Sequence, residues 1–110
     1  MTDRYILKRH KPVKEPNLFR WGRWMHEADR RVALTIQGDV RVSTVFLGLD
    51  HSFGLGSPPL LFETMAFVGH DGVSCERWST WDEAEAGHKR RVAEIFKPTP
   101  ILRLPSEEKT

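Results

Sequence analysis

The sequence predicts a single α+β domain: a four-stranded antiparallel meander with two packed helices and an extra N-terminal edge strand. Three observations support this fold class. Apolar residues recur with period two between residues 32 and 49, while their spacing in residues 18–29 and 81–96 is helical. The pair Gly38-Asp39 interrupts the period-two region as a two-residue hairpin turn would. The chain has 110 residues, enough for one hydrophobic core.

Composition divides the chain into three parts. Residues 1–16 form a basic segment, residues 17–97 the α+β domain, and residues 98–110 a Pro-containing tail. Hydrophobic residues make up 39% of the chain and charged residues 29%, which is typical of a folded globular protein. The N-terminus lacks the apolar stretch of a signal peptide, and no apolar run is long enough to span a bilayer. A single cysteine, Cys75, excludes an internal disulfide framework. We therefore expect a cytoplasmic protein with no membrane contact.

The first helix is predicted over residues 18–29. Asn17 precedes it and is a good N-cap, because its side chain can accept a hydrogen bond from a free amide of the first turn. Gly22 lowers the helical propensity by about 1 kcal/mol relative to alanine and leaves room for a close approach to the sheet. The apolar residues follow 3-4-3 spacing and predict one buried stripe: Leu18, Trp21, Met25 and Ala28.

Four strands are predicted over residues 32–37, 40–49, 60–68 and 73–78, with residues 70–72 as the last turn. From Val45 onward the second strand is apolar on both faces, which is typical of a central strand covered on two sides. In the third strand, Glu63, Met65 and Phe67 share one face. Because the two helices could cover one face, we expect the other to meet the N-terminal segment, the tail or a second copy of the chain.

The second helix is predicted to begin at Ser79 or Thr80 and to end before Pro98. Ser79 with Asp82, or Thr80 with Glu83, can form a capping box. Its apolar stripe consists of Trp81, Ala84, His88, Val92, Ile95 and Phe96.

Two long motifs resemble a family of small proteins encoded by phages and prophages. Residues 43–67 (STVFLGLDHSFGLGSPPLLFETMAF) and 77–88 (RWSTWDEAEAGH) are similar to the family pattern STVFLGLDHxFGxGPPLLFETMVF … RYSTWxEAxxGH. The similarity covers about residues 17–92, with an extra residue in the glycine loop and Trp78 where tyrosine is common. The resemblance implies a phage or mobile-element origin and action in a bacterial cytosol, without implying a particular chemistry.

Four acidic and histidine residues are the candidate catalytic set: His88, Glu63, Asp50 and His51. If Glu63 and His88 met over the sheet, the carboxylate could orient the imidazole and raise its pKa, giving an acid/base pair. The alternative is that His88 is a core histidine satisfied by hydrogen bonds. The histidines do not follow any metal-ligand spacing, so we expect neither a metal site nor a cofactor.

Two further features could bind a ligand or partner. The loop of residues 51–59 contains glycines and serines that could contact a phosphate, although it lacks a Walker A motif and leads into a strand. Around the first helix, an indole lies among guanidinium groups that suit nucleotides or a protein interface. This second candidate set is Trp24, Arg20, Arg23 and Arg31.

Two functional classes follow. The first is a non-enzymatic protein that binds a protein, an anionic or nucleotide ligand, or itself, and that modulates a host process or defence. The second is a small acid/base or metal-assisted enzyme that uses the Glu/His set. A net charge of +2 does not suggest a nucleic-acid binder. We favour the binding class, because no catalytic motif is recognisable in the sequence.

Overall fold

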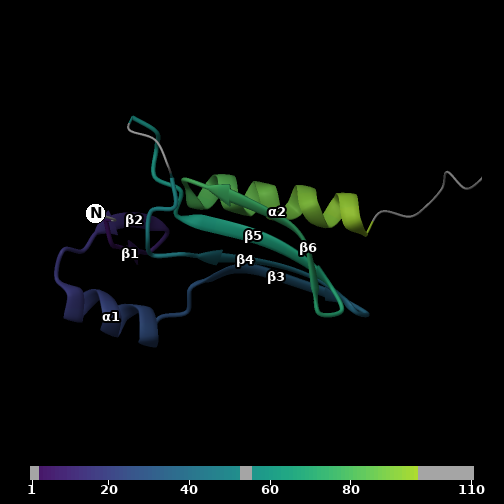
Figure 1. Ribbon diagram of the computed structural model, residues 1–110, viewed down its shortest axis with the longest axis horizontal. Helices are drawn as coiled ribbons and strands as arrows, with labels where there is room; N and C mark the ends of the chain where they lie inside the picture. Colours follow the sequence, from purple (N-terminus) through teal and green to yellow (C-terminus); the bar gives the residue numbers. More distant parts are fainter. Residues whose placement is uncertain (1–2, 53–55, 97–110) are drawn as a thin grey trace, which may run out of the picture.

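A four-stranded antiparallel sheet forms the centre of the structure, and its strands are neighbours in chain order, β3-β4-β5-β6. The computed structural model describes residues 3–52 and 56–96. Figure 1 shows one helix along a face of the sheet, with a small hairpin and the other helix at one end. The elements are β1 (Tyr5–Lys8), β2 (Lys11–Lys14), α1 (Leu18–Glu27), β3 (Arg31–Gln37), β4 (Val40–Phe46), β5 (Phe62–Val68), β6 (Asp71–Trp78) and α2 (Trp81–Ile95). The predicted α+β class and meander are confirmed.

Tight turns with glycine set the register of the meander. Gly38 has φ 63° while Asp39 keeps a negative φ, which is the signature of a type II′ turn. The β5–β6 turn uses Gly69, also at φ 63°, and β6 already begins at Asp71. This last turn therefore lies earlier in the chain than the predicted one, because Gly69 adopts the left-handed conformation more cheaply than the polar residues after it.

Helix α2 covers one face of the sheet. Thr80 Oγ1 accepts a hydrogen bond from the Glu83 amide at 3.1 Å, and Glu83 Oε1 accepts one from the Thr80 amide at 3.2 Å. Of the two predicted capping boxes, the Thr80–Glu83 box is therefore the one that forms. The helix and the sheet enclose the buried apolar residues, which are Val42, Phe46, Leu61, Phe62, Ala66 and Ala84.

Helix α1 does not lie over the sheet as expected. The predicted cap is confirmed, since Asn17 Oδ1 accepts a hydrogen bond from the Arg20 amide at 2.9 Å. The helix packs against β1 and against the chain after β4, where Trp21 Nε1 donates to the Gly48 carbonyl at 3.1 Å. Figure 1 shows α1 beyond the end of the sheet, away from α2.

The glycine that allows the close approach of α1 is Gly48 and not Gly22. A Cβ atom at Gly48 would lie 2.5 Å from Met25 Sδ, and Gly48 has φ 79°. A Cβ at Gly22 would meet nothing within 4 Å. The predicted buried stripe is not buried either: Leu18 is 54% exposed, and Trp21, Met25 and Ala28 are only partly buried. Both expectations were wrong because α1 rests on a short connecting segment and not on a broad sheet.

The N-terminal segment forms a separate hairpin and does not add an edge strand to the main sheet. Strands β1 and β2 pair with each other from Tyr5↔Lys14 to Lys8↔Lys11. The Tyr5 amide donates to the Gly48 carbonyl at 2.8 Å, which joins the hairpin to the domain. Tyr5 and Leu7 pack against the core. The basic segment therefore contributes apolar cover to the domain as well as charge.

One face of the main sheet carries no helix in the described parts of the chain. Side chains alternate across β5, so Phe62, Thr64 and Ala66 are buried beneath α2 while Glu63, Met65 and Phe67 point the other way. The two helices thus do not share one face, and α2 alone covers it. Within residues 3–52 and 56–96, no helix is long and apolar enough to cross a membrane.

Candidate functional site

His88 is buried between α2 and the sheet, and both of its ring nitrogens are hydrogen-bonded. Nδ1 lies 2.8 Å from Thr44 Oγ1, and Nε2 lies 2.9 Å from Thr35 Oγ1. The residue is 4% exposed. The alternative interpretation from the sequence, a core histidine satisfied by hydrogen bonds, agrees with this arrangement.

The histidine belongs to a chain of hydroxyl contacts that the sequence did not reveal. Trp78 Nε1 donates to Thr64 Oγ1 at 3.0 Å, and Thr64 Oγ1 lies 2.7 Å from Thr44 Oγ1. The indole can only donate. When Thr64 and Thr44 each accept one hydrogen bond and donate another, all the donors point the same way, from Trp78 through the two hydroxyls to Nδ1 of His88. Nδ1 is then an acceptor, so the ring proton of His88 lies on Nε2. Burial lowers the pKa of His88, which favours this neutral form.

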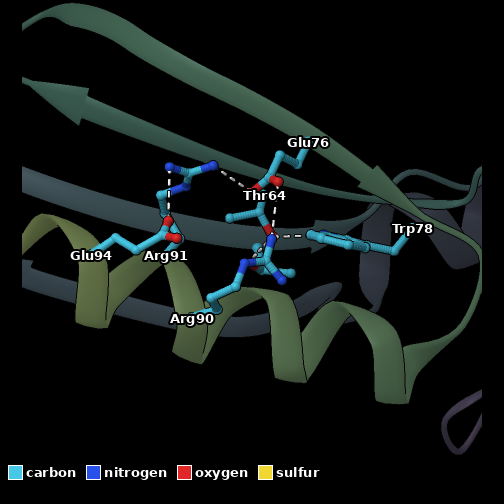
Figure 2. A network of polar contacts seen from close by, with 7 residues as sticks. Thr64, Glu76, Trp78, Arg90, Arg91 and Glu94 are labelled. Carbon is cyan, nitrogen blue, oxygen red and sulfur yellow. Dashed lines mark hydrogen bonds and ion pairs between the residues drawn. The ribbon is translucent and has the colours of Figure 1, made fainter.

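A second polar network fixes α2 to β6 beside this chain. Figure 2 shows Arg90 and Arg91 converging on Glu76, with Trp78 pointing to Thr64. Arg90 pairs with Glu76 Oε2 at 3.0 Å, and Arg91 pairs with Oε1 at 2.8 Å. The hydrogen bond to Glu76 is the main reason that the pKa of Arg91 is raised. These contacts hold the helix on the sheet.

The structure does not bring Glu63 and His88 together. Glu63 lies on the opposite face of the sheet from His88, where its Oε2 pairs with Arg77 Nε at 3.1 Å. Cys75 Sγ donates to the same oxygen at 3.4 Å. Burial, and then the hydrogen bond to Glu63, raise the pKa of the Cys75 thiol. The acid/base pair considered from the sequence therefore has no geometric basis.

Asp50 and His51 organise the chain after β4. Asp50 Oδ1 accepts hydrogen bonds from the amides of Ser52, at 2.8 Å, and Leu60, at 3.0 Å. Burial raises the pKa of Asp50, but hydrogen bonds from the amide and side chain of Ser52 and the amide of Leu60, together with the nearby His51, outweigh it, so the pKa is lowered on balance. His51 Nδ1 donates to the Leu49 carbonyl at 2.9 Å. The hydrogen bonds of both residues therefore stabilise the loop after β4. Residues 53–55, which are part of the glycine-loop candidate, lie outside the described residues.

No catalytic or metal centre emerges from these side chains. Within the two described ranges, no group of three or more His, Cys, Asp and Glu residues is arranged to hold a metal ion. The candidate catalytic residues instead occupy three separate places: the core under α2, the uncovered sheet face and the loop after β4. The described residues also form two broad concave surfaces.

The first concave surface is the uncovered face of the sheet, here called the open face. It contains a hollow of about 460 Å³. Apolar side chains fill its centre, and Ile36 is 61% exposed. Arg41 lies over the Phe67 ring, with its Cζ 4.4 Å from the ring centroid. The residues of the open face are Arg31, Leu34, Ile36, Arg41, Ser43, Val45, Glu63, Met65 and Phe67.

The second concave surface, here called the indole cleft, has a volume of about 640 Å³. It lies where the N-terminal hairpin, α1, the start of β3 and the start of α2 meet. Of the ligand-binding candidates from the sequence, Trp24 and Arg31 line it, whereas Arg20 and Arg23 lie on the exposed surface of α1. Its lining is Leu7, Arg9, His10, Trp24, Asp29, Arg31 and Trp81. Arg9, His10 and Trp81 were not among the ligand-binding candidates from the sequence, because only the tertiary fold brings the β1–β2 turn to α2.

Comparisons with models of protein families, with curated proteins and with solved structures found no match to this chain. The resemblance to small phage and prophage proteins therefore stays a prediction.

Proposed function

We propose that this chain is a phage- or prophage-derived binding protein that engages a protein partner through the open face. The observation that carries the proposal is a hollow sheet face with an apolar centre and arginines at its margin. Met, Phe and Arg are enriched at protein interfaces, and all three occur here. Modulation of a host process or defence would follow from such an origin.

The charges of the open face favour an acidic partner over a second copy of this chain. Arg31 and Arg41 form no ion pair within the described residues, and the acid Glu63 is already paired with Arg77. Two copies placed face to face would bring four such guanidinium groups together without a matching set of carboxylates. Like charges at an interface cost free energy, whereas a partner with acidic groups around an apolar surface would match this face.

The size of the face suggests a weak or transient contact. Four strands spaced about 4.8 Å apart, with seven residues rising about 3.3 Å each, cover roughly 19 Å by 23 Å. This area, about 440 Å² on each partner, is smaller than the roughly 800 Å² per partner of a standard specific interface. We therefore expect micromolar affinity, with most of the binding energy at Met65, Phe67 and Arg41.

Affinity capture from the bacterial host tests the proposal. Tagged protein is compared with Met65→Glu and Arg41→Glu, and with Phe19→Ser as a matched control, because Phe19 is 84% exposed on α1 and lies outside the face. We expect the wild-type protein and Phe19→Ser to capture the same partner protein. Met65→Glu and Arg41→Glu should fail to retain that partner. With that protein purified, both open-face variants should raise Kd more than about tenfold.

Three results would contradict the proposal. One is a captured protein that all variants bind equally. Another is a partner that Arg41→Glu binds more tightly, because the partner would then not be acidic. The third is a dimer in light scattering that Met65→Glu dissociates, which would assign the face to a second copy. Neighbouring genes of phage type support the proposed origin, and neighbours of housekeeping type alone would overturn it.

A further inference from the structure

We propose that the indole cleft, which shares Arg31 with the open face, binds a free mononucleotide. Its volume, about 640 Å³, lies within the range of roughly 300–1,000 Å³ for small-molecule sites. Four separate chain segments form it, and its lining combines two indole rings with two guanidinium groups. A planar base carrying a phosphate is the ligand class that uses both kinds of group.

The two tryptophans present pre-oriented aromatic walls. Trp24 meets Phe46 edge-on, with centroids 5.6 Å apart and rings at 90°, and Trp81 meets Phe62 in the same manner at 6.2 Å and 88°. Because Phe46 and Phe62 are fully buried, these contacts hold the indoles in place. A ring held in this way loses little side-chain entropy when a base stacks on it.

Trp81 already stacks with a flat heteroaromatic ring. The imidazole of His10 lies parallel to it, with the ring centroids 3.7 Å apart and an angle of 2° between the planes. This pair forms an aromatic slab at the side of the cleft. Stacking of bases on such slabs tolerates all four bases, because each base has an aromatic face.

The cations of the cleft are available to a phosphate. Arg9 and Arg31 are exposed and form no ion pair within the described parts of the chain. The one carboxylate of the lining, Asp29, accepts a hydrogen bond from the Arg31 amide through its Oδ1 at 3.0 Å. Guanidinium groups bind phosphate through charge-assisted, often bidentate hydrogen bonds.

The conformation of Arg9 is the second sign of a site. Arg9 has φ 61°, a left-handed conformation that glycine or asparagine adopts at lower cost. The β1–β2 turn would therefore be easier to form with glycine, yet it places a guanidinium at the cleft. Non-glycine residues held in this region often mark ligand sites.

A free mononucleotide fits better than a nucleic acid. The volume of the cleft suits a single nucleotide. The chain as a whole carries a net charge of only +2, too little for strong phosphate-backbone binding.

Titration calorimetry of the full chain tests the proposal, with AMP as the probe and adenosine and ribose 5-phosphate as its two halves. We expect AMP to bind at least about tenfold more tightly than either half, because stacking and phosphate contacts both contribute. GMP, CMP and UMP should bind within about tenfold of AMP, because stacking depends little on base identity.

Arg9→Gly is the decisive variant, because it removes the guanidinium while glycine suits the positive φ, so the turn still forms. It should weaken AMP binding about tenfold, and Arg31→Gln should do the same. Arg20→Gln, which changes an arginine of α1 outside the cleft, should leave the affinity unchanged. Met65→Glu should also leave it unchanged, which separates this site from the open face.

Several results would overturn the proposal. One is the absence of AMP binding at millimolar concentration. Another is binding that Arg9→Gly and Arg31→Gln both leave intact. If ribose 5-phosphate bound as tightly as AMP, the cleft would be an anion site in which the indoles have no role. If adenosine bound as tightly as AMP, the arginines would have no role. Tighter binding of a short single-stranded oligonucleotide than of AMP would identify a nucleic-acid site instead.

Discussion

Threonine hydroxyls decide the chemical state of His88. Thr44 and Thr35 occupy both ring nitrogens, and the chain continues through Thr64 to Trp78. A buried imidazole in this setting gains nothing from a second proton, because protonation would place an uncompensated charge in the core. The threonines thus turn a titratable residue of a helix into a neutral part of the core.

The first prediction concerns the pH dependence of stability. The folded protein holds the pKa of His88 below its ordinary value of 6.5, because burial disfavours the imidazolium. When folding lowers the pKa of a group, the resulting stabilisation is complete at pH values above the pKa of the unfolded state. It is lost as the pH falls toward the pKa of the folded state. We expect the free energy of unfolding to decrease by up to about 1.4 kcal/mol per pH unit below 6.5.

Urea unfolding at a series of pH values between about 7.5 and 5 measures this slope. The variant His88→Gln keeps a polar side chain without a titratable group and should show a flatter dependence. If the wild-type protein and His88→Gln have the same slope, His88 does not contribute to it.

At the scale of elements, glycines set how closely the helices approach their neighbours. Gly87 of α2 lies against the indole of Trp78, and a Cβ there would come within 2.3 Å of the ring. Trp78 cannot easily move, because its Nε1 bonds to Thr64 and Arg90 lies over its ring. Gly22 of α1 has open space instead. Two helical glycines of the same chain therefore have opposite roles.

The second prediction uses this pair. Gly22→Ala should raise the free energy of unfolding by about 1 kcal/mol, because alanine has the higher helical propensity and meets no neighbour. Gly87→Ala has the same gain in propensity but should lower stability by roughly 1–3 kcal/mol, because the new methyl overpacks against Trp78. Urea midpoints measure both variants. Equal changes would show that α2 can shift away from Trp78 without cost.

On the scale of the whole molecule, one face of the sheet is covered by a helix and the other face is not. Helix α2 and the core cover one face, while α1 and the N-terminal hairpin pack at the end of the sheet. The open face and the indole cleft exist because of this arrangement. A helix α1 laid beside α2 on the same face of the sheet, as the sequence suggested, would have moved Trp24 out of the cleft.

The third prediction concerns the N-terminal hairpin. Removal of residues 1–16 deletes Tyr5 and Leu7, which pack against the core, and uncovers Trp81, on which His10 stacks. We expect the free energy of unfolding to fall by roughly 2–4 kcal/mol from the lost apolar burial. Urea unfolding, with circular dichroism to verify the remaining sheet, measures the loss.

Lys8→Ala, an exposed change in the same hairpin, should alter stability by less than about 0.5 kcal/mol. An unchanged midpoint after truncation would mean that the hairpin does not stabilise the domain.

The sequence by itself determined the local features of this protein. The caps at Asn17 and Thr80, the turn at Gly38 and the alternation that places Glu63, Met65 and Phe67 together all depend on residues close in the chain. Such features follow from backbone hydrogen bonding and from side-chain periodicity, which a sequence displays directly.

Only the tertiary structure decided where those elements pack and which residues meet. The partners of His88 come from β3 and β4, and the indole cleft joins residues as distant as Arg9 and Trp81. The separation of Glu63 from His88 depends on which face α2 covers. The position of α1 depends on the close contact between Met25 and Gly48. These outcomes arise from packing between segments far apart in the chain, which local propensity and periodicity do not encode.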